Sequence, residues 1–132
     1  MGWNKGRWAA GEDAGIMNKK RLSIVKSQIV IKGKYVEVEV GKKVIKIIFT
    51  MHSLDSMQDY DISLEKALDY LLFADEIIKG HGGRFIAHRK LDRYLARVVY
   101  EHDMDNITVV TFYISYADRY FKGGMYEDKI LR

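Results

Sequence analysis

The feature of this sequence that most constrains its fold is a helical apolar pattern followed by three alternating segments, between Leu64 and Tyr113. Apolar residues recur three and four positions apart from Leu64 to Ile78, which predicts one main amphipathic helix. Ser63 suits the start of this helix as a cap, and Gly80 suits its end. The alternation that follows predicts three strands, over Arg84–His88, Tyr94–Tyr100 and Ile107–Ile114. Short connections favour antiparallel pairing, so we expect the helix to pack on a small antiparallel sheet.

The segment before this helix has the pattern of a β-meander. Residues 23–49 alternate, are rich in Val and Ile, and contain two glycine turns, at Gly33 and Gly41. The connection that follows leaves open a short first helix from Ser53 to Tyr60, with Ser53 as its cap and His52 just before it. We therefore predict a single α+β domain over residues 22–132. It has an N-terminal β-meander, one or two helices, and an antiparallel sheet of three to four strands packed on the main helix.

Residues 1–21 lack a periodic apolar pattern and contain four glycines. Trp3 and Trp8 stand beside Lys5 and Arg7, so a flexible arm here could stack on bases and contact phosphates. The alternative is a frayed terminus or the remnant of an expression tag, which we favour.

The charge distribution suits a polyanionic partner. The chain carries a net charge of +4, with balances of +7 over residues 1–50, −5 over 51–82 and +2 over 83–132. Ordinary solubility charge is the alternative. The chain has no cysteine, which excludes disulfides, thiolate chemistry and cysteine-based zinc sites. We see neither a long apolar window nor the apolar core of a signal peptide, and therefore expect a cytoplasmic protein with no membrane association.

Known local motifs for nucleotide binding, metalloprotease and serine hydrolase chemistry are absent from the sequence. The four histidines lack partners four residues away, so we expect no metal site and no cofactor. What remains is a set of His, Arg, Lys, Thr and Tyr residues, which is the set that metal-free RNA cleavage uses. A base removes the proton of the 2′-hydroxyl, that oxygen attacks the phosphorus, and an acid protonates the leaving 5′-oxygen. A cation stabilises the charge on the pentacoordinate phosphate.

The segments IFTMHSLD, DEIIKGHGGRFIAH and VVTFYIS, in this order, carry a resemblance to a known family. Over about residues 47–131 the chain resembles the barnase–colicin–RelE-type ribonuclease superfamily. It is closest in pattern to BrnT-like toxins and to related small families of unknown function.

The resemblance implies roles for individual residues. His52 matches a histidine that opens the helical part and would be the acid or base, and Arg84 matches a phosphate-contacting position. Thr111 and Tyr113 match the strand end that orients the scissile phosphate. Together these four form the expected catalytic set. The expected RNA-binding residues are Arg119 and Lys122, which match basic tail positions of the family, and His88 and Arg97, which the strand pattern itself places on the sheet.

Each of these residues also has a structural interpretation. His52 and His88 can be surface or half-exposed histidines, Arg84 and Arg97 can be charges at the edge of the core, and Tyr113 can be an aromatic at its rim. The sequence also lacks the arginine that many relatives carry about seven residues after the opening histidine.

The leading expectation is therefore a metal-independent endoribonuclease of the toxin type, with RNA as substrate. Such a toxin would need an antitoxin protein that covers its basic face. One alternative is a non-catalytic module that binds RNA or DNA through the same face. The other is a viral or mobile-element interaction protein whose meander adds strands to a partner.

Overall fold

The computed structural model describes residues 21–128 and 130–131 of the chain. The predicted N-terminal arm, apart from Arg21, lies outside the described residues. The described elements, in chain order, are β1 (Ser23–Val30), β2 (Gly33–Val40), β3 (Lys43–Thr50), α2 (Met51–Asp59), α3 (Leu64–Leu72), β4 (Glu76–Lys79), β5 (Phe85–Leu91), β6 (Tyr94–His102), β7 (Ile107–Tyr116) and α4 (Ala117–Tyr120).

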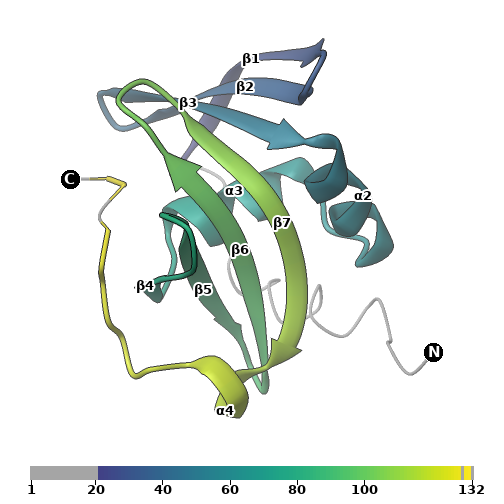
Figure 1. Ribbon diagram of the computed structural model, residues 1–132. Helices are drawn as coiled ribbons and strands as arrows, with labels where there is room; N and C mark the ends of the chain where they lie inside the picture. The colour runs from purple at the N-terminus through teal and green to yellow at the C-terminus, as the bar shows by residue number, and fades with distance from the viewer. Residues whose placement is uncertain (1–20, 129, 132) are drawn as a thin grey trace.

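The strands form one continuous sheet of seven, in the order β1-β2-β3-β7-β6-β5-β4 (Figure 1). All neighbouring strands pair antiparallel except β3 and β7, which pair in parallel over three residues, Ile47–Phe49 against Ile107–Val109. The α+β class and the meander are confirmed. The expected sheet of three to four strands was too small, because the β3–β7 pairing joins the meander to the main sheet and β4 adds a further strand.

The main helix differs from its prediction at its C-terminal end. Ser63 caps α3, accepting a hydrogen bond from the Lys66 amide at 3.1 Å, as predicted. The helix ends at Leu72 instead of continuing to Ile78, and residues 76–79 form the edge strand β4. Short apolar runs fit both the helical and the strand period, and the antiparallel partner β5 here favours the strand. Arg89 closes the helix end, because its Nη1 donates to the Phe73 carbonyl oxygen at 3.0 Å.

The first helix begins earlier than the sequence suggested. Thr50 caps α2, and its Oγ1 accepts a hydrogen bond from the Ser53 amide at 3.1 Å. His52 therefore lies within the first turn of α2 and not before a cap at Ser53. The helix lies beside β7 (Figure 1), and the Thr50 hydroxyl fixes this position by donating to the Val110 carbonyl oxygen at 3.0 Å.

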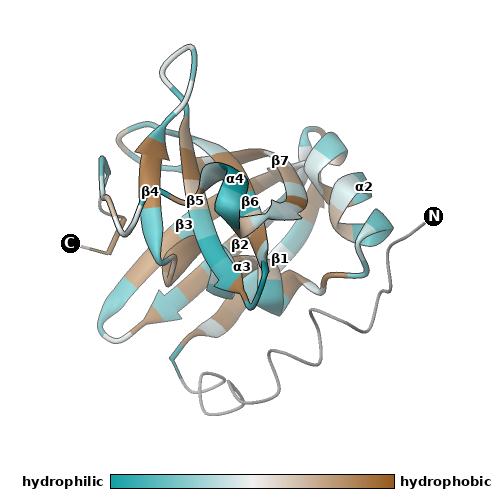
Figure 2. Cartoon of the chain, turned by 90° about the horizontal axis from the view of Figure 1, so that it is seen from below, coloured by the Kyte–Doolittle hydropathy of each residue, from teal (hydrophilic) through white to brown (hydrophobic). Residues whose placement is uncertain are grey.

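The main core lies between α3 and one face of the sheet. Apolar and polar residues alternate along much of the sheet (Figure 2), which gives the sheet an apolar face toward α3. The cross-strand row Ile77, Ala87, Val98 and Phe112 is buried on that face. Tyr70 of α3 stacks on Phe112, with ring centroids 6.2 Å apart. No helix among the described residues is long and apolar enough to cross a bilayer.

Gly33, at the turn between β1 and β2, is the glycine that the meander depends on most. A Cβ atom at this position would lie 2.0 Å from the Phe49 carbonyl oxygen, which belongs to a paired backbone and cannot move freely. We predict that Gly33→Ala lowers the free energy of unfolding by about 3 kcal/mol, through steric overlap and backbone strain. Urea denaturation measures this change.

Gly41→Ala is the matched control at the next turn. Gly41 has a φ of 62° but nothing within 4 Å of its Cβ position, so only backbone strain of about 1 kcal/mol is expected. Equal losses for the two variants would contradict the proposed overlap at Gly33.

Candidate functional site

A row of polar side chains crosses the face of the sheet that α3 does not cover. Glu76 of β4 pairs with His88 of β5, His88 with Arg97 of β6, and Arg97 with Tyr113 of β7. Residues directly opposite one another on neighbouring strands point to the same face, so the four side chains lie side by side. Glu76 and His88 are fully buried, and Arg97 is 5% exposed. We call these four residues the polar row.

Hydrogen bonds link three members of the polar row in sequence. Arg97 Nε donates to His88 Nε2 at 3.1 Å, and His88 Nδ1 lies 2.6 Å from Glu76 Oε2. A guanidinium group has no acceptor, so His88 Nε2 must accept and Nδ1 must carry the proton. His88 is therefore neutral and donates to the Glu76 carboxylate. Glu76 fixes the imidazole, and the imidazole fixes the guanidinium.

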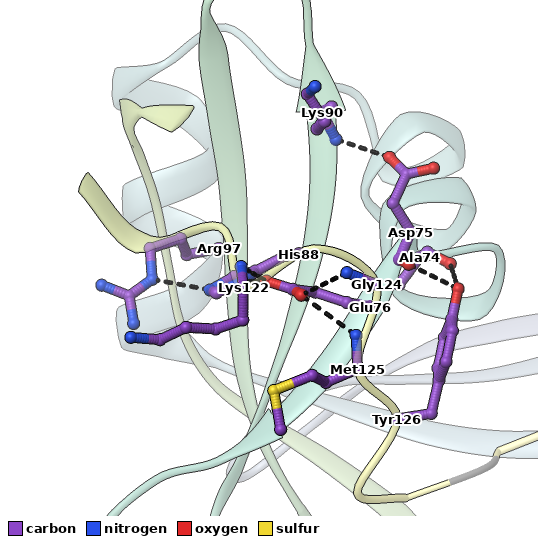
Figure 3. Close-up of polar contacts among 10 residues, drawn as sticks. All are labelled: Ala74, Asp75, Glu76, His88, Lys90, Arg97, Lys122, Gly124, Met125 and Tyr126. Carbon is purple, nitrogen blue, oxygen red and sulfur yellow. Dashed lines mark hydrogen bonds and ion pairs between the residues drawn. The ribbon is translucent and has the colours of Figure 1, made fainter. Parts of the chain in front are cut away.

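The Glu76 carboxylate also holds the C-terminal part of the chain. It accepts hydrogen bonds from the backbone amides of Lys122 at 2.7 Å, Gly124 at 3.0 Å and Met125 at 3.2 Å (Figure 3). Residues 121–128, which we call the C-terminal strap, thereby cross the polar row. The strap continues along the β4 edge, where Tyr126 pairs in parallel with Ile77.

The protonation states in the row follow from burial and hydrogen bonding. Burial lowers the pKa of His88 below its ordinary value, and the nearby Arg97 and Lys122 charges lower it further against the opposing effect of Glu76. Burial alone would raise the pKa of Glu76. The hydrogen bonds from His88 and the three strap amides outweigh burial and hold the Glu76 pKa below its ordinary value.

Arg97 is the cation of the site. Its guanidinium lies 3.7 Å from the ring centroid of Tyr120 on α4 and 5.1 Å from that of Tyr113. Within the described residues it forms no ion pair with a carboxylate, because His88 separates it from Glu76. Its two terminal nitrogens point away from His88, and the Lys122 side chain extends in the same direction (Figure 3). Burial raises the pKa of Tyr113, so its hydroxyl stays protonated at neutral pH.

The structure brings together four of the residues named from the sequence: His88, Arg97, Tyr113 and Lys122. It leaves the other four outside this group. Thr111 pairs with Val99 in the next cross-strand row, which also contains Ile86. Arg84 precedes β5 and forms an ion pair with Glu101 at 3.0 Å, with both side chains nearly half exposed. Arg119 is exposed on α4.

His52 is exposed in the first turn of α2, and its ring makes no polar contact with any described residue. Helical spacing places it one turn before Ser56, whereas the buried side of α2 carries Ser53 and Met57. Tyr60 packs edge-on against Phe112 of β7, with ring centroids 6.1 Å apart. His52 is therefore not on the buried side of α2, and its imidazole does not touch the polar row.

Two residues that define the site were missed from the sequence. Glu76 fell within the predicted helix. An acidic residue directly before Ile77 and Ile78 is an unusual start for a buried edge strand, so the sequence did not indicate one here. Tyr120 lies in an aromatic tail with no regular spacing, which gave no signal.

Comparisons with known proteins add no assignment. No family model matches the chain, and no match was found among curated proteins or among solved structures. Within the part of the chain that the structure describes, no group of three or more His, Asp or Glu side chains is placed to hold a metal ion.

We predict that Glu76→Gln lowers the free energy of unfolding by about 3 kcal/mol, the cost of leaving buried donors without their charged acceptor. The substitution removes the charge that balances Arg97 and places an amide nitrogen among donors from His88 and the strap. Glu127→Gln, at an exposed position of the strap, is the matched control and should leave stability unchanged. Chemical denaturation at pH 7 measures both, and similar values for the two variants would contradict the role of Glu76.

His88 also predicts a pH dependence. Its pKa is lowered in the folded state, so below about pH 6.5 the unfolded chain binds a proton that the folded chain does not. Stability should therefore fall as the pH drops below 6.5, by at most about 1.4 kcal/mol per pH unit for one proton. We predict that His88→Gln removes this component from unfolding curves measured between pH 7 and pH 5. His81→Gln, at an exposed position, should retain it, and an unchanged slope in His88→Gln would contradict the prediction.

Proposed function

We propose that the protein is an endoribonuclease of the toxin type that binds RNA at the polar row and cleaves it without a metal ion. The observation that carries this proposal is the state of Arg97. Its guanidinium is fixed from behind by His88, lies beside the Tyr113 ring, and has no carboxylate partner among the described residues. The resemblance to ribonuclease toxins and the net charge of +4 support the same conclusion.

A phosphate is the ligand that suits this arrangement. Guanidinium groups bind phosphate through two parallel N–H donors, and the terminal nitrogens of Arg97 point away from His88 (Figure 3). Tyr113 adds a protonated hydroxyl, and Lys122 adds a second positive charge. Because the orientation of Arg97 is set before the ligand arrives, its charge can stabilise the pentacoordinate phosphate without reorganisation.

The structure supports different roles for the two histidines. His88 is buried and both of its ring nitrogens are engaged, so we assign it a positioning role toward Arg97 in place of the direct RNA contact expected from the sequence. His52 is exposed and has the acid–base chemistry that the reaction needs. In the proposed reaction a base takes the 2′-hydroxyl proton, the 2′-oxygen bonds to phosphorus, and the P–O5′ bond breaks as an acid protonates O5′. The product is a 2′,3′-cyclic phosphate.

The remaining expected residues extend the same surface. Thr111 lies on β7 one cross-strand row from Tyr113 and would orient the phosphate, while Arg84 and Arg119 would contact neighbouring phosphates. Contact by Arg84 requires that RNA compete with Glu101 for its guanidinium. An acidic antitoxin would bind over these cations, and cytoplasmic RNA would be the substrate.

A second candidate is a non-catalytic RNA-binding module on the same face. One observation favours it: the His52 ring makes no contact with the polar row. Tyr120 covers the Arg97 guanidinium, which obstructs RNA at this site in either candidate. Cleavage by the proposed enzyme therefore requires α4 to move far enough for a phosphate to reach Arg97.

We predict that the purified protein cleaves single-stranded RNA in excess EDTA. His52→Ala should reduce the rate by at least about 100-fold through loss of acid–base catalysis, and Arg97→Lys by a similar factor, because lysine cannot reproduce the fixed fork of donors. His81→Ala, at an exposed position in the turn before β5, should cleave like the unchanged protein. Gel analysis of a labelled oligonucleotide follows the reaction, and a 2′-deoxy substitution at the cleaved position should block it.

The outcomes separate the two candidates. Cleavage that survives both His52→Ala and Arg97→Lys would exclude the proposed catalytic site. No cleavage, together with RNA binding that weakens steeply with salt, would favour the binding module.

A further inference from the structure

A hollow lined in part by two aromatic residues lies beside α4, at the end of the sheet where β5 turns into β6. Its volume is about 540 Å³, and its lining includes Lys90, Asp92, Arg93, Tyr116, Asp118 and Phe121. These residues come from the end of β5 and the turn after it, the end of β7, the start of α4 and the start of the C-terminal strap. We propose that this hollow is a binding subsite for a nucleobase of single-stranded RNA. The inference rests on the proposed RNA-binding function and names a second part of the same surface.

The two aromatic residues are held in place from behind. The Tyr116 ring stacks on the buried Tyr94 ring, with centroids 5.4 Å apart and an interplanar angle of 26°, and Tyr116 remains 49% exposed. The Lys90 ammonium lies 5.1 Å from the centroid of the Phe121 ring. Both rings therefore have supported positions before a ligand arrives. Exposed aromatic rings with fixed positions are the platforms on which proteins stack unpaired bases.

The charges around the hollow favour a neutral ligand with hydrogen-bonding edges. Lys90 and Arg93 contribute two positive charges, and Asp92 and Asp118 contribute two negative charges. The two carboxylates disfavour a phosphate here, in contrast to Arg97. Within the described chain, no hydrogen bond or ion pair engages the side chains of Asp92, Arg93 or Asp118. They are available to accept from and donate to the edge of a base.

The hollow lies at a distance from Arg97 that suits one nucleotide. Lys90 and Leu95 form the cross-strand pair two residues away from the pair of His88 and Arg97, a separation of about 7 Å along the strands. The end of α4 also places the two sites next to each other. Tyr120 lies over Arg97, and the next residue, Phe121, lines the hollow. Tyr116 pairs with Tyr94 and leaves β7 on the same face as Phe112, so it reaches the hollow only at the end of the sheet. A nucleotide whose phosphate contacts Arg97 can therefore place a base against Phe121, at the sheet end that Tyr116 also lines.

The test uses a labelled single-stranded oligonucleotide of mixed sequence made of 2′-O-methyl RNA, which cannot be cleaved by 2′-hydroxyl attack. Its dissociation constant is measured by fluorescence anisotropy at several salt concentrations. We expect the double variant Tyr116→Leu, Phe121→Leu to weaken binding at least about tenfold, the loss of one base–aromatic stack, with no change in salt dependence. Tyr35→Leu, on the distant meander, is the matched control and should bind like the unchanged protein.

Two further measurements do not depend on how the variants fold. An abasic version of the oligonucleotide should bind the unchanged protein at least about tenfold more weakly than the intact one. Free nucleosides at millimolar concentration should shift the amide resonances of residues 116–121 in a nitrogen–proton spectrum.

Equal binding of abasic and intact oligonucleotides, with unmoved amide resonances, would overturn the subsite even if the protein cleaves RNA. Base-dependent binding without cleavage would support the subsite and reject only the catalytic part of the proposed function.

Discussion

The buried Glu76 carboxylate is the interaction on which the arrangement of this face depends. It accepts a hydrogen bond from His88 and three from the backbone of the strap, and so satisfies a charge that would otherwise be too costly to bury. One end of this network fixes the Arg97 guanidinium, and the other fixes residues 122–125. The position of the cation and the path of the C-terminal strap are therefore set by the same side chain.

The two faces of the main sheet have different roles. The face toward α3 is apolar and supplies the core through residues such as Val98 and Phe112. The opposite face carries charges that the strap and α4 partly cover, and it is there that the proposed phosphate and base sites lie side by side. A rigid sheet supported from behind by a packed helix keeps such sites in fixed positions, while the short α4 above them has few packing contacts.

Local patterns in the sequence predicted the meander, the Ser63 cap and the three central strands, because each depends on spacing within a short window. They did not predict the β3–β7 pairing or the strand at Glu76, since both depend on partners far along the chain. The same limit applies to the site. His88, Arg97 and Tyr113 come together through cross-strand register, whereas Glu76 was assigned to a helix and Tyr120 gave no pattern. The alternating pattern predicted these strands but not the hydrogen bonds that orient Arg97.

The parallel contact between β3 and β7 has a consequence for how the chain reaches its native state. The partners lie 60 residues apart, and everything between them must be synthesised before they meet. Until then the β3 edge, with Ile47 and Phe49, has no neighbour on that side. Closure of so long a loop slows folding, and until it closes the nascent chain exposes an unpaired, aggregation-prone strand edge. A growing chain with the meander formed and β7 still absent would therefore expose this apolar edge.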